Sequence, residues 1–324
     1  MEAFGYANPK TLKEAFASLG SSWDEAMVLA GGTDLISMMK DRVMSPRRVV
    51  NIKGLAELKG ISQAAGGIRI GSNVTLDELA SNPLVRAQFP ALVQAALGVA
   101  SPQMRNMGTV GGDLCQRPRC WYYRQGFGLL GMKNGSSLIP NGENRYHAIF
   151  GGGPAYFVSP SSFGPALVAL DAKVKIASAQ GVREVKASDF FVIPTSDTQR
   201  ETAIQPGDIV IEIVIPTGST KNATYEVRER DGLDWPLAAA SVSLKMNGTK
   251  VASAKVVLGH VAPTPWAAAA AEAALVGKSI DEATAEAAGL AAVQGAQPLS
   301  QNEYKVQLAK VSVKRALLAA AGKA

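Results

Sequence analysis

The sequence predicts an α+β protein of two domains, on three observations. The chain has 324 residues, and a domain usually holds about 100–200 residues. Up to residue 216, segments with strand patterns and helix patterns are mixed. Beyond it, the chain shows three strand patterns followed by helix patterns, an order typical of an α+β domain. We therefore expect a domain boundary near residue 216, with the smaller domain over residues 217–324.

The first domain begins with a helix and then a strand that runs into a glycine pair. Residues 9–20 carry apolar side chains at helical spacing. Residues 27–30 form a compact apolar strand pattern, Gly31 and Gly32 follow it, and helical character resumes over residues 35–39. The predicted order is strand, glycine loop, helix.

Further elements follow in the same mixed order. Strands are predicted at residues 49–52, 68–71, 173–176 and 209–215, and helices at residues 75–79, 89–99 and 166–170. Thr75 and Glu78 have the spacing of a helix capping box. Residues 117–160 are irregular, and we expect a long functional loop there because regular elements resume directly afterwards.

The second domain is predicted as strands followed by helices. The strands lie at residues 224–230, 238–246 and 251–258. The last two are joined by Asn247 and Gly248, a pair typical of a hairpin turn. Two Ala-rich helices and a terminal helix complete the chain.

Composition excludes several classes of function. The net charge is +6, and the 33 Lys and Arg are scattered, so we expect no nucleic-acid partner. No apolar run reaches the ~20 residues of a membrane span. Motifs of zinc peptidases and serine hydrolases are absent, so His147 and His260 receive no role and we assign neither catalytic nor metal-binding residues.

The cysteines and the N-terminus indicate a reducing compartment. Cys115 and Cys120 cannot form a disulfide framework, and their spacing is not that of a metal site. The first residues lack the basic start and apolar stretch of a secretory signal. We expect a cytoplasmic protein, with periplasmic export alongside a signal-bearing partner as the alternative.

Two glycine motifs are candidates for binding a pyrophosphate. Gly31 and Gly32 follow a buried strand, and a second motif runs from Gly108 to Gly112. Glycine lets backbone N–H groups approach phosphate oxygens that a Cβ would keep away. Each motif also contains a threonine hydroxyl. The alternative for either is a plain tight turn, and neither matches the Rossmann pattern.

Longer motifs resemble a known family. They lie, in order, at residues 29–35, 101–114, 159–162, 166–172, 227–230 and 234–237. Together they resemble the FAD-binding medium subunit of the xanthine dehydrogenase or molybdenum hydroxylase family, over nearly the whole chain. Residues 116–124 and 142–149 resemble, more narrowly, the FAD subunit of bacterial periplasmic-type aldehyde oxidoreductases.

The resemblance implies a fold and a set of cofactor-binding residues. The fold is an FAD-binding PCMH-type domain with two α+β subdomains, residues 1–57 and 58–216. A CO dehydrogenase flavoprotein C-terminal-like domain with a three-stranded antiparallel sheet follows over residues 217–324. The expected FAD-binding residues are Leu29, Ala30, Gly31, Gly32, Thr33, Asp34, Leu35, Ser101, Met107, Thr109, Gly111, Gly112, Asp113, Cys115, Ser162 and Glu226.

The resemblance also implies a role within a heterotrimer. A large molybdopterin subunit would oxidise the substrate, a small [2Fe-2S] subunit would pass electrons to the FAD of this chain, and an external acceptor would take them. The complex would be an aldehyde oxidoreductase. Two rival interpretations are a self-contained flavin oxidoreductase and a structural subunit of the same complex that has lost FAD.

This chain departs from the family pattern in two respects. Relatives in the narrower group often carry a [4Fe-4S] cluster held by four cysteines. Here only Cys120 stands where the first ligand would be, so we expect no [4Fe-4S] cluster in this chain. The family generally has Asn or Ser at the position of Asp113, Asp at Ser162 and Lys at Glu226. The changes at Asp113 and Glu226 would bring negative charge toward an anionic cofactor.

Overall fold

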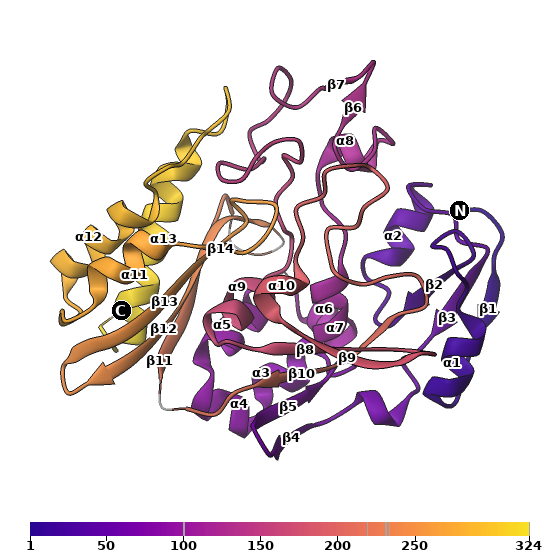
Figure 1. Ribbon diagram of the computed structural model, residues 1–324, viewed down its shortest axis with the longest axis horizontal. Coiled ribbons are helices and arrows are strands. Elements are labelled where there is room, and N and C mark those ends of the chain that lie inside the picture. Colours follow the sequence, from indigo (N-terminus) through magenta and orange to yellow (C-terminus); the bar gives the residue numbers. More distant parts are fainter. Residues whose placement is uncertain (100, 219, 231, 233, 324) are drawn as a thin grey trace.

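A computed structural model describes residues 1–99, 101–218, 220–230, 232 and 234–323. Its described residues form three main sheets, each with its own helices, and the molecule mixes helices and strands as the sequence predicts (Figure 1). No helix in the described ranges is both long and apolar enough to cross a membrane.

The N-terminal sheet is parallel and positions the first glycine motif. Its strand order is β1-β3-β2, and helices α1 and α2 accompany it. The bounds are β1 Gly5–Ala7, α1 Leu12–Ser18, β2 Ala26–Leu29, α2 Leu35–Lys40 and β3 Arg48–Asn51. Val49 and Val50 of the central strand are fully buried. Residues 30–34 therefore leave the carboxyl end of an edge strand and enter a helix, which confirms the predicted order of strand, glycine loop and helix.

The second sheet is antiparallel, with the strand order β4-β5-β10-β8-β9. The strands are β4 Ile61–Ala64, β5 Gly67–Gly71, β8 Lys173–Ser178, β9 Gly181–Lys186 and β10 Ile209–Ile215. The helical segments around it are η1 Ala56–Leu58, α3 Leu76–Ser81, α4 Pro83–Gln88, α5 Pro90–Gly98, α6 Pro102–Met107, α7 Val110–Cys115, α9 Phe163–Ala169 and α10 Ala187–Phe190. Ile213 pairs with Ile70 on one side and Val174 on the other, and all three are buried. The capping box of Thr75 and Glu78 is confirmed.

The C-terminal sheet contacts the helices that follow it in the chain and also α5 and α9. The strands are β11 Lys221–Arg228, β12 Pro236–Asn247, β13 Lys250–Gly259 and β14 Trp266–Ala267, and the helices are α11 Ala269–Leu275, α12 Glu282–Ala292 and α13 Tyr304–Ala320. The hairpin turn is confirmed, because Asn247 pairs with Lys250 and Gly248 has a φ of 58°. The sheet has four strands rather than the predicted three, since the two-residue β14 adds to its edge. So short a strand carries no alternating pattern in the sequence.

The second glycine motif is a helix start, which corrects the predicted loop. Thr109 is the N-cap of α7, and its hydroxyl accepts a hydrogen bond from the N–H of Gly112 at 3.1 Å. Gly111 and Gly112 therefore lie in the first turn of a helix. A threonine cap satisfies an N–H group that a helix start would otherwise leave unpaired. Sequence reasoning weighed the glycines and overlooked this cap.

Residues 117–160 are irregular as predicted, with three short elements: α8 Trp121–Arg124, β6 Met132–Lys133 and β7 Ser136–Ser137. The part of this segment around Tyr146 and His147 is bonded to the start of α13. Lys305 is buried there and donates hydrogen bonds to the carbonyls of Tyr146, His147 and His260 at 3.2, 3.1 and 2.7 Å. Asn302 donates to the His147 carbonyl as well, at 3.1 Å. We call residues 302 and 305 with these carbonyls the α13 clamp.

We expect the folded protein to lose stability in acid because of His147. Its Nε2 lies 3.2 Å from the Cys120 sulfur, and burial, with Lys305 contributing, lowers its pKa to about 4. The unfolded chain takes up this proton near pH 6.5, so stability falls as the pH drops from 6.5 toward 4. Between pH 6.5 and 5 we expect a loss of about 2 kcal/mol at this residue. Denaturant unfolding at both pH values checks this, and His147→Phe should show a correspondingly smaller loss; an unchanged loss would contradict it.

Candidate cofactor site

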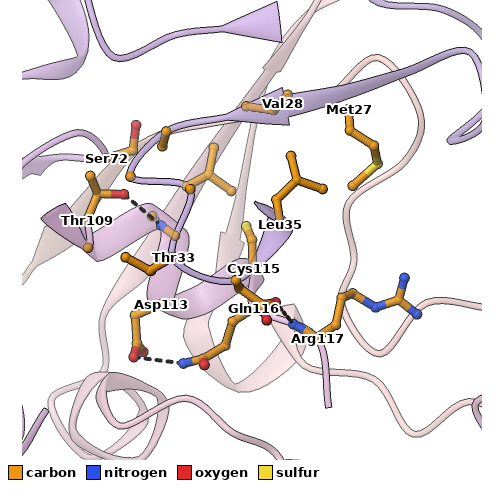
Figure 2. A pocket seen from close by; sticks show the side chains of 18 of the residues that line it. Met27, Val28, Thr33, Leu35, Ser72, Thr109, Asp113, Cys115, Gln116 and Arg117 are labelled. Carbon is orange, nitrogen blue, oxygen red and sulfur yellow. Dashed lines mark hydrogen bonds between the residues drawn. The ribbon is translucent and has the colours of Figure 1, made fainter. Parts of the chain in front are cut away.

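A cleft lies between the N-terminal sheet, α7 and the segment that precedes β10. Its empty volume, the part open to solvent included, is about 1250 Å³. The residues around it are Trp23, Met27, Val28, Ala30, Gly31, Gly32, Thr33, Asp34, Leu35, Met38, Ile52, Ser72, Asn73, Leu76, Val99, Met104, Gly108, Thr109, Gly111, Gly112, Asp113, Cys115, Gln116, Arg117, Arg119, Arg200, Ile204, Asp208, Ile209, Val210 and Trp235. Both glycine motifs thus line one cleft (Figure 2).

Gly31 is where the two motifs touch. A Cβ at this position would lie 2.0 Å from the carbonyl oxygen of Met107 and 3.1 Å from the Cα of Gly108. Real Cβ atoms do not approach backbone that closely. Glycine is therefore required because the loop packs directly on the backbone at the end of α6.

The first loop offers unused hydrogen-bond donors. Gly32 has a φ of +76°, a conformation that favours glycine. Among the described residues, the N–H groups of Gly31, Gly32, Thr33 and Asp34 have no hydrogen-bond acceptor. Four consecutive free amides at the end of a strand suit the oxygens of a phosphate group.

The second motif shapes the cleft more than it donates. The N–H of Val110 donates to the Val74 carbonyl and that of Gly111 to the Ser72 carbonyl, both at 2.9 Å. A Cβ on Gly111 would lie 2.8 Å from the Cβ of Ser72. The start of α7 is thus fixed against residues 72–74, and the free donors come from the first loop.

Asp34 joins the first loop to the irregular segment. One carboxylate oxygen lies 2.9 Å from Arg124 and 3.1 Å from Arg119, and the other accepts the Arg117 N–H at 2.8 Å. Only 13% of the Asp34 side chain is exposed. Asp34 thereby holds one wall of the cleft in place.

Asp113 is buried in the wall of the cleft. One oxygen accepts hydrogen bonds from the Ser161 hydroxyl at 2.5 Å and the Phe163 N–H at 3.2 Å, and the other accepts from Gln116 at 2.9 Å. Figure 2 shows Gln116 turned toward Asp113. Burial raises the Asp113 pKa to about 6, although the Ser161 bond opposes the shift. The bonds from Ser161 and Phe163 tie α7 to the turn at the start of α9.

Glu226 is buried and lies outside the cleft lining. Its carboxylate forms an ion pair with Arg228, which also donates to the Gly98 carbonyl. Burial raises the pKa of Glu226, whereas Arg228 and the Ser162 hydroxyl favour its charged form. The three residues that depart from the family pattern, Asp113, Ser162 and Glu226, thus belong to one internal polar network.

Arginines supply positive charge around the cleft. Arg119 stacks on Trp235 with its Cζ 4.3 Å from the ring centroid, and Arg200 stacks on Trp23 at 3.9 Å. Arg117 forms an ion pair with Glu201 at 2.5 Å. With Arg124, four arginines face the carboxylates of Asp34, Glu201 and Asp113, and Arg183 neutralises Asp208, which leaves one positive charge in excess. The wall therefore favours an anionic ligand.

The two thiols lie in different surroundings. Cys115 lines the cleft, and burial raises its pKa to about 12. Cys120 contacts His147, and burial raises its pKa also. No group of three or more His, Cys, Asp or Glu in the described part of the chain could hold a metal ion.

The structure brings most of the expected FAD-binding residues together. Those that line the cleft are Ala30, Gly31, Gly32, Thr33, Asp34, Leu35, Thr109, Gly111, Gly112, Asp113 and Cys115. Leu29, Ser101, Met107, Ser162 and Glu226 are not part of the lining. Leu29 ends β2, Ser101 caps α6, and Met107 contacts Gly31 through its carbonyl group.

Sequence reasoning missed Trp23, Arg119, Arg200 and Trp235 as cleft residues. Arg119 and Trp235 lie within motifs used for the resemblance, so a closer reading could have found them. Trp23 and Arg200 carry no local signal, because a contact between segments so distant in the chain depends on the tertiary fold.

Comparisons with known proteins show the family to which the chain belongs. Residues 2–218 match the family model described as FAD binding domain in molybdopterin dehydrogenase, and residues 223–320 match the CO dehydrogenase flavoprotein C-terminal domain. This chain is an FAD-binding subunit of the molybdenum hydroxylase family.

Relatives span nearly the full length of this molybdenum hydroxylase FAD subunit. It is 32% identical to the aldehyde oxidoreductase FAD-binding subunit PaoB of Escherichia coli (strain K12), over 96% of either chain. It is 30% identical to the carbon monoxide dehydrogenase medium chain of Hydrogenophaga pseudoflava, over 98% of this chain and 96% of that one. A chain of quinoline 2-oxidoreductase from Pseudomonas putida 86 superposes with a TM-score of 0.78 at 28% identity, covering 99% of this chain and 98% of that chain.

Proposed function

We propose that this chain carries electrons in an aldehyde oxidoreductase. FAD in the cleft would receive them from a [2Fe-2S] subunit, which a large molybdopterin subunit reduces, and would pass them to an external acceptor. We further propose a domain boundary near residue 216 and a cytoplasmic location. The aldehyde is favoured by residues 116–124 and 142–149 and by the similarity to PaoB over nearly the whole chain.

The observation that carries the proposal is the first glycine loop. Its four free amides stand on a wall with an excess positive charge, and a pyrophosphate requires both features. Thr33 and Thr109 lie beside them in the cleft. The residues present therefore fit a dinucleotide cofactor.

The protein's own part in the mechanism is to hold and shield the cofactor. FAD, when bound, supplies the redox chemistry, because its isoalloxazine ring takes up and releases electrons one or two at a time. Residues 31–34 would hold the pyrophosphate, Asp34 would fix the arginines of the wall, and the buried side chains of Leu35 and Met38 would exclude water.

The geometry speaks against both rivals. A subunit that had lost FAD would not require four unpaired backbone N–H groups in residues 31–34. It would also not require the close contact of Gly31 with the Met107 carbonyl. A self-contained oxidoreductase needs an acid or base free to act on a substrate. The carboxylates of the cleft are instead engaged: Asp34 with arginines, Asp113 with three donors, and Asp208 with Arg183 at 2.6 Å.

Two measurements test the proposal. The visible spectrum of the purified chain should show oxidised flavin bands, and their absence would refute the FAD role. Co-expression with candidate partner subunits should yield a complex in which aldehydes reduce the flavin. Flavin reduction by an aldehyde in the isolated chain would favour the self-contained enzyme, and reduction of the complex by xanthine but by no aldehyde would refute the proposed substrate.

A further inference from the structure

Arg200 forms an unusual contact beside the first strand of the cleft. Its guanidinium lies over the Trp23 ring at 3.9 Å, and its Nη2 lies 3.7 Å from the sulfur of Met27. Met27 precedes Gly31 by four residues, which is about 13 Å along an extended strand. The Trp23–Arg200 pair therefore stands on the strand side of the glycine loop.

The charge of Arg200 is not balanced by an ion pair among the residues that the structure describes. The neighbouring carboxylate, Glu201, is engaged by Arg117 at 2.5 Å. Burial, with Arg117 contributing, lowers the pKa of Arg200 to about 10, so the guanidinium stays protonated at neutral pH. It offers a planar cation at the cleft, already stacked on an aromatic ring.

The surroundings of the two Arg–Trp stacks differ. Met27, which contacts Arg200, lines the cleft together with the apolar residues Val28, Ile204 and Val210. Arg119, which stacks on Trp235, is bonded to Gln116 at 3.0 Å and to Asp34 beyond the loop. Figure 2 shows Met27 and the Arg117 side chain on one side of Cys115, and Asp113 with Gln116 on another.

The isoalloxazine ring and the adenine ring of FAD bind well in different surroundings. The isoalloxazine ring carries several carbonyl and nitrogen groups that require hydrogen-bond partners. The polar side of the cleft, with Arg119, Gln116 and Asp34, offers such partners. A purine base binds well by stacking on aromatic rings and arginine planes, and such stacking depends little on hydrogen bonds. With the pyrophosphate on residues 31–34, the apolar side is left for the adenine.

We infer that Trp23 and Arg200 select FAD over FMN, by stacking on the adenine ring. The inference rests on the proposed FAD site and deepens it, because neither residue belongs to the glycine motifs. Trp23 and Arg200 would add affinity only for a ligand that carries the adenosine half, and would leave the contacts to the flavin half unchanged.

Equilibrium binding of three ligands to the full chain, stripped of cofactor, tests the inference. FAD, FMN and ADP are titrated by flavin fluorescence and calorimetry into the parent chain and into Trp23→Leu, Arg200→Ala and Arg200→Lys. We expect Trp23→Leu and Arg200→Ala to raise the Kd for FAD and ADP about tenfold and to leave that for FMN within twofold. Arg200→Lys keeps the charge and should fall between.

Two controls make the result decisive. Arg315→Ala removes an exposed arginine of α13 and should change no Kd. Trp235→Ala, at the other stack, should weaken FAD and FMN alike. Equal loss of FMN and FAD in the Trp23 and Arg200 variants, or no loss of FAD, would overturn the inference. A parent chain that binds neither flavin would instead refute the proposed function.

Discussion

Replacing Gly31 with alanine is expected to push the two glycine motifs apart and to empty the flavin site. The added methyl group would lie 2.0 Å from the Met107 carbonyl oxygen, and that atom belongs to backbone. Relief requires the loop to move off the end of α6. Overpacking of this kind typically costs 1–3 kcal/mol. Because the overlap is with backbone, we expect about 3 kcal/mol or more in the free energy of unfolding.

Flavin content and denaturant unfolding measure the effect. The flavin bound per chain should fall at least tenfold in Gly31→Ala. Gly54→Ala is the matched control, because a Cβ there meets nothing within 4 Å and Gly54 has no positive φ. Parent-like flavin content and stability in Gly31→Ala would show that the motifs are not in contact.

Replacing Asp34 with asparagine is expected to loosen the wall of the cleft. The change removes the negative charge that Arg119 and Arg124 share, and an amide nitrogen cannot accept the Arg117 N–H or an arginine hydrogen. Breaking a buried ion pair from one side costs about 3–5 kcal/mol. We expect about 3 kcal/mol here, because Arg119 is partly exposed.

Denaturant unfolding of the stripped chain isolates this loss from any effect of the cofactor. Limited proteolysis should cut within residues 117–124 sooner in Asp34→Asn than in the parent. Asp24→Asn removes an exposed carboxylate of the same type and should match the parent. If Asp34→Asn also unfolds like the parent, the carboxylate does not hold the irregular segment.

The sequence predicted the first glycine loop and the order of elements around it, because those features depend on neighbouring residues. A strand pattern, a glycine pair and a helix pattern lie within residues 27–39, and the structure keeps that order. The reason for Gly31 was beyond sequence reasoning, since its contact with Met107 joins residues 76 positions apart.

Contacts between distant segments also explain the rest. The sequence alone predicts that the altered residues Asp113 and Glu226 direct negative charge at the cofactor. In the structure Asp113 is held by Ser161, Phe163 and Gln116, and Glu226 pairs with Arg228. A motif records which residue is present, whereas its effect depends on partners that only folding brings near.

The α13 clamp has a consequence for truncated chains. Lys305 and Asn302 hold the backbone of His147, His147 contacts Cys120, and Cys120 directly follows Arg119 of the cleft wall. Helix α13 thus supports a wall that lies nearly 200 residues earlier in the chain. A chain that ends before residue 302 lacks that support, so we expect it to hold this wall less firmly and to bind the cofactor more weakly.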